Sequence, residues 1–170
     1  MASERFVDAL NAQIAREFSA AHQYVAVGAY YAAETFPRLA EFFYAQADEE
    51  RGHAMKMVNY LLDRGAQPDI GGVDAPRAAF ADHVEPIKIA LEQERHVTVR
   101  IGELFEIARE THDYQSEQFM QWFLQEQVEE EASMQDLLTI AERTRSSPMQ
   151  LEDYLARDRP GGQSAAPPAP

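Results

Sequence analysis

The chain has 170 residues, no cysteine and a formal net charge of −14. The lack of cysteine excludes disulfides, thiolate metal sites and cysteine nucleophiles. The negative charge argues against general nucleic-acid binding, which needs clustered Lys and Arg, and favours cations as ligands. Charged residues recur throughout, so no segment has the roughly 20 apolar residues of a membrane span. With no apolar leader at its start, we expect a one-domain cytoplasmic protein.

The first half of the chain is predicted to form two long helices. Ser3 is a suitable N-cap for a first helix that runs to about Ala33. Pro37 favours the start of a second helix, which ends near Arg64 and Gly65. Apolar residues at spacings of three and four form a seam along each helix, as expected for packing in a bundle.

The stretch from Gly65 to His83 is rich in Gly, Pro and Asp and is predicted to be a long loop. Roughly 18 extended residues at about 3.3 Å each span some 60 Å, more than the roughly 40 Å length of the second helix. Such a loop can return the chain to the start of the bundle. The second and third helices are therefore expected to be parallel.

Two further long helices follow the loop. The third is predicted from about Val84 to Thr111, and the fourth from an Asp113 cap to about Arg143. Two hairpins joined by one long crossover make an all-α four-helix bundle. A short fifth helix is predicted at 149–156, which completes a domain at 1–157. The Pro-, Gly- and Ala-rich tail at 158–170 is expected to be disordered.

Polar residues interrupt the apolar seam of all four long helices. They are Glu17 on the first helix, Glu50 and His53 on the second, Glu94 on the third, and Gln127 and Glu130 on the fourth. An ionised carboxylate in an apolar core costs several kcal/mol unless it is paired or binds a metal. Antiparallel packing brings these mid-helix positions to one level, so the sequence predicts a buried metal site.

The ligand types indicate which metal this site would hold. Carboxylates with one imidazole suit iron or manganese. Five such ligands are too many for one ion unless some bridge, so two ions are expected, with Glu50 placed between them. Dinuclear bundles carry Glu-x-x-His on two helices, but here Ser133 stands where the second histidine would be, and Gln127 is a weaker substitute.

These motifs resemble the bacterial non-haem ferritins, over nearly the whole chain to about residue 157. The resemblance rests on the runs AREFSAAHQY, ADEERGHA, LEQE and WFLQEQVEEE. It implies the ferritin-like version of the bundle, with Glu17, Glu50 and His53 on a first iron. It also implies Glu50, Glu94 and Glu130 on a second iron, with Gln127 nearby. A third, weaker iron position would fall to Glu49, Glu126, Glu129 and Glu130.

The resemblance also bears on aromatic residues and on haem. Tyr24 would hydrogen-bond a ligand or donate an electron, and Trp122 is a second oxidisable ring; packing in the core is the competing interpretation of both. Haem-binding bacterioferritins have a haem-ligating methionine directly after the bridging glutamate, where this chain has Arg51. Haem is therefore not expected. The DNA-coating mini-ferritins fit less well, because they lack a fifth helix.

By this resemblance, the chain is an iron-storage ferroxidase that oxidises Fe(II) with O₂ or H₂O₂. Its subunits would form a hollow 24-mer that holds ferric oxyhydroxide. Glu117 and Gln121 either line entry channels of that shell or lie on the solvated surface. One alternative is a small-oligomer di-iron oxidase or peroxidase that acts on an organic or peroxide substrate. Another is a metal-free helical interaction module, which the cost of the buried carboxylates disfavours.

Overall fold

A computed structural model describes residues 3–157, which contain five α-helices and no strand. The helices are α1 (Glu4–Ala33), α2 (Pro37–Asp63), α3 (Glu85–Glu110), α4 (Tyr114–Arg143) and α5 (Met149–Arg157). The predicted all-α bundle with a short fifth helix is confirmed. The tail at 158–170, for which disorder was predicted, lies outside the described residues. Within the described part of the chain, no helix is long and apolar enough to cross a membrane.

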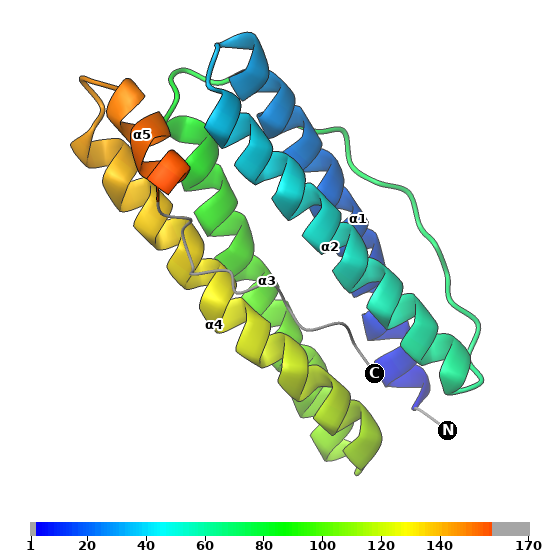
Figure 1. The fold of residues 1–170 in the computed structure, drawn as a ribbon. Coiled ribbons are helices and arrows are strands. Elements are labelled where there is room, and N and C mark those ends of the chain that lie inside the picture. The colour runs from blue at the N-terminus through cyan, green and yellow to red at the C-terminus, as the bar shows by residue number, and fades with distance from the viewer. Residues whose placement is uncertain (1–2, 158–170) are drawn as a thin grey trace.

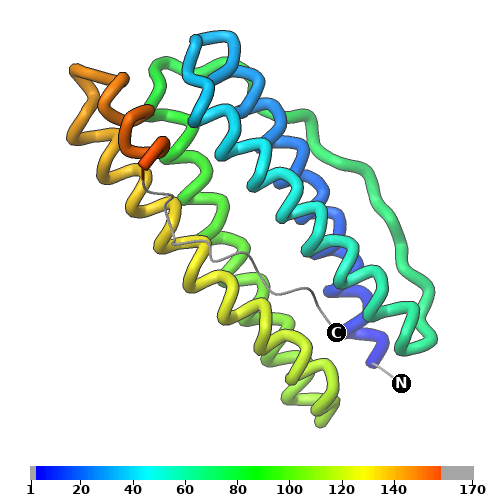
Figure 2. The backbone as a smooth tube through the Cα atoms, in the orientation of Figure 1, coloured from blue at the N-terminus to red at the C-terminus, as the bar shows by residue number. Residues whose placement is uncertain are grey.

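The four long helices form two antiparallel hairpins, α1 with α2 and α3 with α4, which pack side by side (Figure 1). The crossover at 64–84 runs along α1. The backbone N–H of Asp69 donates to Asn11 Oδ1 at 2.9 Å, and that of Arg77 donates to Gln23 Oε1 at 2.8 Å. Figure 2 shows that this crossover returns the chain to the other end of the bundle, so α2 and α3 are parallel as predicted.

Side chains cap α1 and α4 at the positions that the sequence indicated. Ser3 Oγ accepts a hydrogen bond from the backbone N–H of Phe6 at the start of α1, and Asp113 accepts one from Ser116 at the start of α4. The α3–α4 turn is tight because His112 adopts a left-handed conformation, with φ of 54°. These caps satisfy backbone donors that have no partner within the helix.

The short helix α5 is joined to the start of α2 by a carboxylate. The two oxygens of Glu152 accept hydrogen bonds from the backbone N–H groups of Arg38, at 2.8 Å, and Leu39, at 3.0 Å. The N-cap residue of α2, Phe36, makes no such side-chain bond. Glu152 therefore supplies the N-terminal cap that α2 lacks in its own sequence, and its charge also favours that end of the helix dipole.

The apolar core is divided into two clusters, one toward each end of the bundle. On α1 one cluster ends at Ile14 and the other begins at Tyr24, which leaves Glu17 between them. On α2 the corresponding limits are Ala47 and Met57. The same gap occurs on α3 and α4. Together the gaps form a polar layer that crosses the middle of the bundle.

Candidate metal centre

The polar layer contains the six residues that interrupt the seams. Each is at most 6% exposed to solvent: Glu17, Glu50, His53, Glu94, Gln127 and Glu130. Buried carboxylates at this density are uncommon in proteins unless they are paired or bind a cation. The four helices bring them together because each contributes its interruption at the same height.

Three of these residues form a compact group that fits a cation. Glu17, Glu50 and His53 each offer a ligand atom, and these atoms all lie within 4.8 Å of one another. His53 Nδ1 is 3.6 Å from Glu50 Oε2. Glu17 Oε1 accepts a hydrogen bond from Gln13, but the buried Oε2 atom has no hydrogen-bond partner. A buried acceptor without a donor is rare in native proteins, and a bound cation would satisfy it.

Glu94 lies in the same layer and is held from two sides. Tyr24 donates its O–H to Glu94 Oε1, and Gln127 Nε2 donates to Glu94 Oε2 at 3.3 Å. Among the described residues, the ligand atoms of Glu50, Glu94 and Glu130 do not all lie within 4.8 Å of one another, as those of Glu17, Glu50 and His53 do. Their joint role at a second iron therefore stays a prediction.

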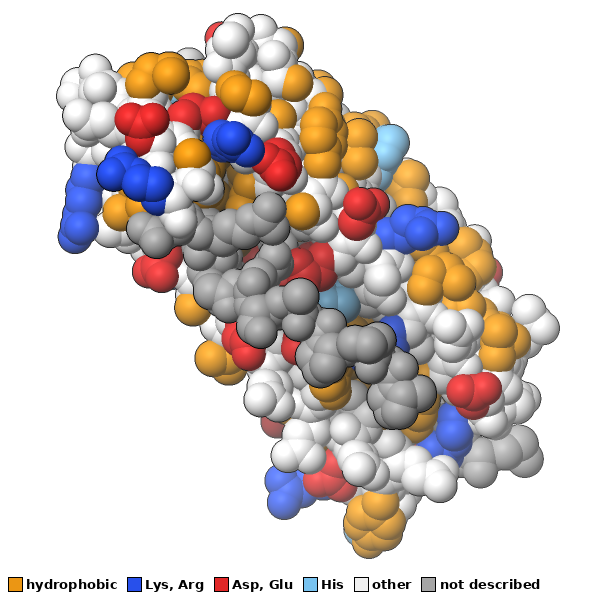
Figure 3. Space-filling view, viewed as in Figure 1, with side chains coloured by type: hydrophobic (Ala, Val, Ile, Leu, Met, Phe, Trp, Pro, Cys, Tyr) orange, Lys and Arg blue, Asp and Glu red, His pale blue; other side chains and the backbone are white. Residues whose placement is uncertain are grey.

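A second compact group lies at the edge of the layer and combines Glu49, His53 and Glu126. Gln46 Nε2 donates to Glu49 Oε2 at 2.8 Å, which orients that carboxylate. Glu129, predicted to share this third position, is exposed and is not part of the compact group. On the face where α2 and α4 adjoin, acidic side chains and a histidine reach the surface midway along the bundle (Figure 3).

The electrostatics of the layer oppose ionisation of its carboxylates. Burial, and then the nearby charge of Glu50, raises the pKa of Glu17 well above its usual value. Burial and Glu94 do the same to the pKa of Glu50. Burial, with Glu49 and Glu94 as the next causes, raises the pKa of Glu130 to about 9. A cation in the layer would reverse this effect because it stabilises the charged forms.

The aromatic candidates differ in how they approach the layer. Tyr24 is fully buried, and burial followed by the charge of Glu94 raises its pKa. Trp122 is half-buried and meets the His53 ring edge-on, with 5.7 Å between ring centroids. Lys56 Nζ lies 3.4 Å from the centroid of the Trp122 ring, in a cation–π contact. Tyr24 touches a predicted ligand through a hydrogen bond, whereas Trp122 packs behind one.

The remaining predicted residues lie outside the layer. Arg51 and Gln121 are exposed, and Glu117 is partly buried. Sequence reasoning missed Gln13, although it is fully buried and stands four residues before Glu17 on the same helix face. That i, i+4 spacing was the available signal.

Comparison with known proteins identifies close relatives. Residues 7–144 match the family model described as a ferritin-like domain. A ferritin BfrB of Mycobacterium tuberculosis (strain Erdman) is 47% identical over 154 residues, which cover 91% of this chain and 85% of the relative. A bacterial non-heme ferritin of Staphylococcus aureus (strain MRSA252) is 46% identical over 132 residues, or 78% of this chain and 80% of the relative.

Solved structures agree with the sequence relatives. The open pore ferritin of the archaeon Archaeoglobus fulgidus has a TM-score of 0.87 and 31% identity, over 92% of this chain and 97% of that one. An engineered closed form of the same protein has a TM-score of 0.89 and 30% identity, over 93% and 98% of the two chains. The five-helix fold of this chain is thus the fold of these solved ferritins.

Proposed function

The chain belongs to the ferritin family, and from this premise we propose that it stores iron and oxidises Fe(II) at the polar layer. The observation that carries the proposal is the buried group Glu17, Glu50 and His53, in which one carboxylate oxygen lacks any donor. Iron is the substrate and the stored product here, so the residues must both bind it and release it.

The reaction transfers one electron from each of two Fe(II) ions to O₂, which takes up two protons and leaves as H₂O₂ with two Fe(III). Glu17, Glu50 and His53 would hold one ion, and Glu50, Glu94 and Glu130 the other, with Glu50 between them. Oxygen ligands suit both oxidation states of iron. With no second Glu-x-x-His motif, the coordination of the two ions would be partly open, which would let the ferric product leave.

Further residues would act around this pair. Tyr24 would keep Glu94 oriented through its hydrogen bond. Gln127 would lie beside the second ion. The group Glu49, His53 and Glu126, with Glu129 and Glu130 close by, would form the weaker third position and pass cations between the layer and the surface. Burial and contacts support these roles, and each role can be tested by substitution of the residue.

The proposal extends to the assembly. Relatives that span most of this chain are ferritins, which supports a homo-oligomeric shell of twenty-four chains of 19.2 kDa each, located in the cytoplasm. Closed shells of identical subunits follow from symmetric, self-complementary interfaces. No haem is proposed, since Arg51 follows Glu50 at the position where a haem ligand would be needed.

The test combines particle mass with iron oxidation. Light scattering should give twenty-four times the chain mass, and aerobic Fe(II) should be oxidised rapidly, as followed by the ultraviolet absorbance of ferric iron. Glu50→Ala should abolish rapid oxidation, because it removes the bridging carboxylate. The matched control is Glu106→Ala, which removes an exposed carboxylate from α3 and should leave the rate unchanged. A small oligomer that binds two irons and retains them would refute storage and indicate a di-iron oxidase or peroxidase.

A further inference from the structure

The amide of Gln127 is held in one orientation by acceptors on α3. Its Nε2 donates to the backbone oxygen of Glu94 at 3.2 Å, to Glu94 Oε2 at 3.3 Å and to Thr98 Oγ1 at 3.3 Å. A backbone carbonyl has no hydrogen to donate, so the amide nitrogen of Gln127, and not its amide oxygen, must face the backbone oxygen of Glu94. The amide oxygen of Gln127 must therefore face away from these α3 acceptors.

Thr98 is itself held by Glu131, a residue with no role so far. Thr98 Oγ1 lies 2.5 Å from Glu131 Oε1 and 3.1 Å from the backbone oxygen of Glu94. A hydroxyl has one hydrogen, and the shorter contact with a carboxylate is the stronger one. The hydrogen bonds therefore run in one direction, from Gln127 to Thr98 and from Thr98 to Glu131. Both Thr98 and Glu131 are partly buried.

Thr98 becomes more important when Glu94 binds a cation. The amide nitrogen of Gln127 has two hydrogens and, in the structure described, three acceptors. Once Glu94 Oε2 turns to a cation, two acceptors remain, the backbone oxygen of Glu94 and Thr98 Oγ1. Two hydrogens then match two acceptors. Without the Thr98 hydroxyl, one buried N–H would have no partner, which destabilises this orientation of the amide.

We propose that Thr98, held by Glu131, is a positioning residue that keeps the Gln127 amide oxygen available to the cation at Glu94 and Glu130. The inference rests on the proposed function, since it assumes a cation at that position. A neutral oxygen at this place binds a trivalent ion less tightly than a second imidazole or carboxylate would. The Thr98 and Glu131 pair would thus stabilise the second position without adding charge to it.

The test measures the binding of Zn(II), an ion that takes similar ligands and is not oxidised. Calorimetry gives the affinities, and anomalous diffraction from Zn(II)-soaked crystals assigns them to positions. Thr98→Val removes the hydroxyl with little change in shape and should weaken Zn(II) at the Glu94 position about tenfold, in the range usual for lost outer-sphere hydrogen bonds. Zn(II) at Glu17, Glu50 and His53 should be unaffected. Thr98→Ser keeps the hydroxyl and should restore the affinity to within twofold of wild type.

A graded series tests the direction of the hydrogen bonds. Glu131→Ala should lower the Zn(II) affinity at the Glu94 position less than Thr98→Val does. In Glu131→Ala, the Thr98 hydroxyl can donate its hydrogen to the backbone oxygen of Glu94 and still accept a hydrogen bond from Gln127. The matched control is Asp136→Ala, an exposed acidic residue on the same helix, which should have no effect. Should Thr98→Val fail to fold, Thr98→Ala removes the same hydroxyl without adding a methyl group against Glu131.

The outcomes separate this inference from the function on which it rests. If wild type binds Zn(II) at both positions and Thr98→Val does so equally well, the positioning role is wrong. Equal losses in Thr98→Val and Thr98→Ser would also overturn it, since packing and not the hydroxyl would then matter. If wild type binds no Zn(II) in the layer, the proposed iron centre itself fails.

Discussion

Two buried tyrosines of α1 illustrate how similar residues differ in their chemical surroundings. Tyr24 donates its hydroxyl hydrogen to Glu94 in the polar layer, whereas Tyr31 donates to the backbone oxygen of His83 at 2.6 Å, near the end of the crossover. Both rings are fully buried and pack against Phe43. The two residues therefore share a structural role, and only Tyr24 touches a predicted iron ligand.

This pair gives a matched test at the residue scale. Tyr24→Phe and Tyr31→Phe should each cost about 1–2 kcal/mol of stability, the usual effect of one lost buried hydrogen bond. Only Tyr24→Phe should slow Fe(II) oxidation, because Glu94 loses its orientation. Thermal unfolding and stopped-flow absorbance measure the two effects. A similar slowing in Tyr31→Phe would show that a general loss of stability, and not the lost hydrogen bond to Glu94, slows the reaction.

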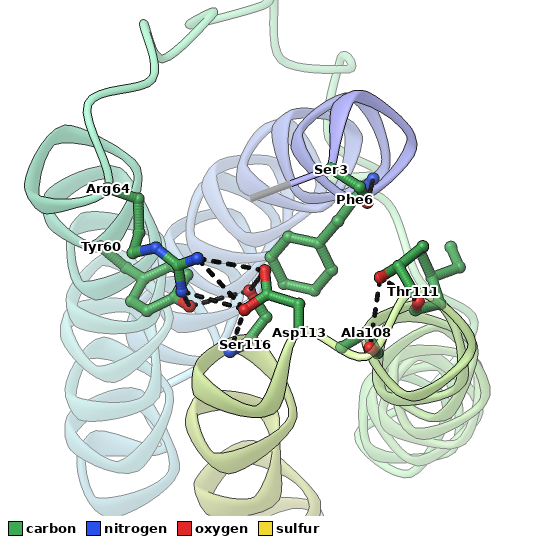
Figure 4. A network of polar contacts seen from close by, with 9 residues as sticks. Ser3, Phe6, Tyr60, Arg64, Ala108, Thr111, Asp113 and Ser116 are labelled. Atoms are coloured by element: carbon green, nitrogen blue, oxygen red, sulfur yellow. Dashed lines mark hydrogen bonds and ion pairs between the residues drawn. The ribbon is translucent and has the colours of Figure 1, made fainter. Parts of the chain in front are cut away.

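At the scale of elements, the end of α2 and the start of α4 are joined by a polar network (Figure 4). The guanidinium of Arg64, at the end of α2, lies 3.1 Å from Asp113 Oδ1, and Asp113 also accepts from the hydroxyl and backbone N–H of Ser116. Tyr60 completes the network through Ser116 and Arg64. The network thus fixes the α3–α4 turn against the end of α2.

The network predicts a pH dependence. Partial burial alone would raise the pKa of Asp113, but hydrogen bonds from Ser116 and the charge of Arg64 outweigh it and hold the pKa below its usual value. A lowered folded-state pKa contributes stability that is present above the unfolded pKa of about 3.9 and is lost as the pH falls through the folded pKa.

The variant Asp113→Asn isolates this contribution, because asparagine keeps an N-cap but loses the charge. It should be less stable than wild type at neutral pH by about 1–3 kcal/mol. The difference should shrink as the pH falls below about 4. Denaturant unfolding at several pH values measures it, with Asp63→Asn at an exposed site on α2 as control. A difference that is constant with pH would contradict the assignment.

For the whole molecule, the polar layer separates two apolar clusters and connects all four long helices. A cation at Glu17, Glu50 and His53 would join α1 to α2 within one hairpin, and a cation at Glu50, Glu94 and Glu130 would join helices of both hairpins. Without a cation, the buried carboxylates must take up protons or repel one another. If the layer binds a cation as proposed, the stability of the molecule should depend on that cation.

Removal of the cation should lower stability in a predictable way. Zn(II) at 100 times its Kd should add about 2.7 kcal/mol per site relative to chelated protein. Glu17→Gln should lose the gain from the position formed by Glu17, Glu50 and His53, yet the chelated variant should be no less stable than chelated wild type, because it buries one carboxylate fewer. Thermal unfolding with chelator or Zn(II) tests both statements. A chelated variant that is clearly less stable would mean that Glu17 has a structural role unrelated to cations.

The helices and the composition of the site could be predicted from sequence because they depend on local information. Ser3, Pro37 and Asp113 mark helix starts by the capping chemistry of their own side chains. Seam periodicity shows that Glu50 and His53 face inward. Gln13 and Glu152 were not predicted, since their importance comes from partners elsewhere in the fold.

The sequence by itself determined an all-α bundle with one long crossover and a polar layer. Helix periodicity and capping residues are local signals, and the cost of burying a carboxylate can be recognised from its place on an apolar seam. Only the tertiary structure decided which ligand atoms converge. It groups Glu49 with His53 and Glu126 and leaves Glu129 outside. It also links Thr98 to Glu131 across α3 and α4. These pairings depend on the rotation of each helix about its axis and on side-chain conformation, which are set by packing between distant segments.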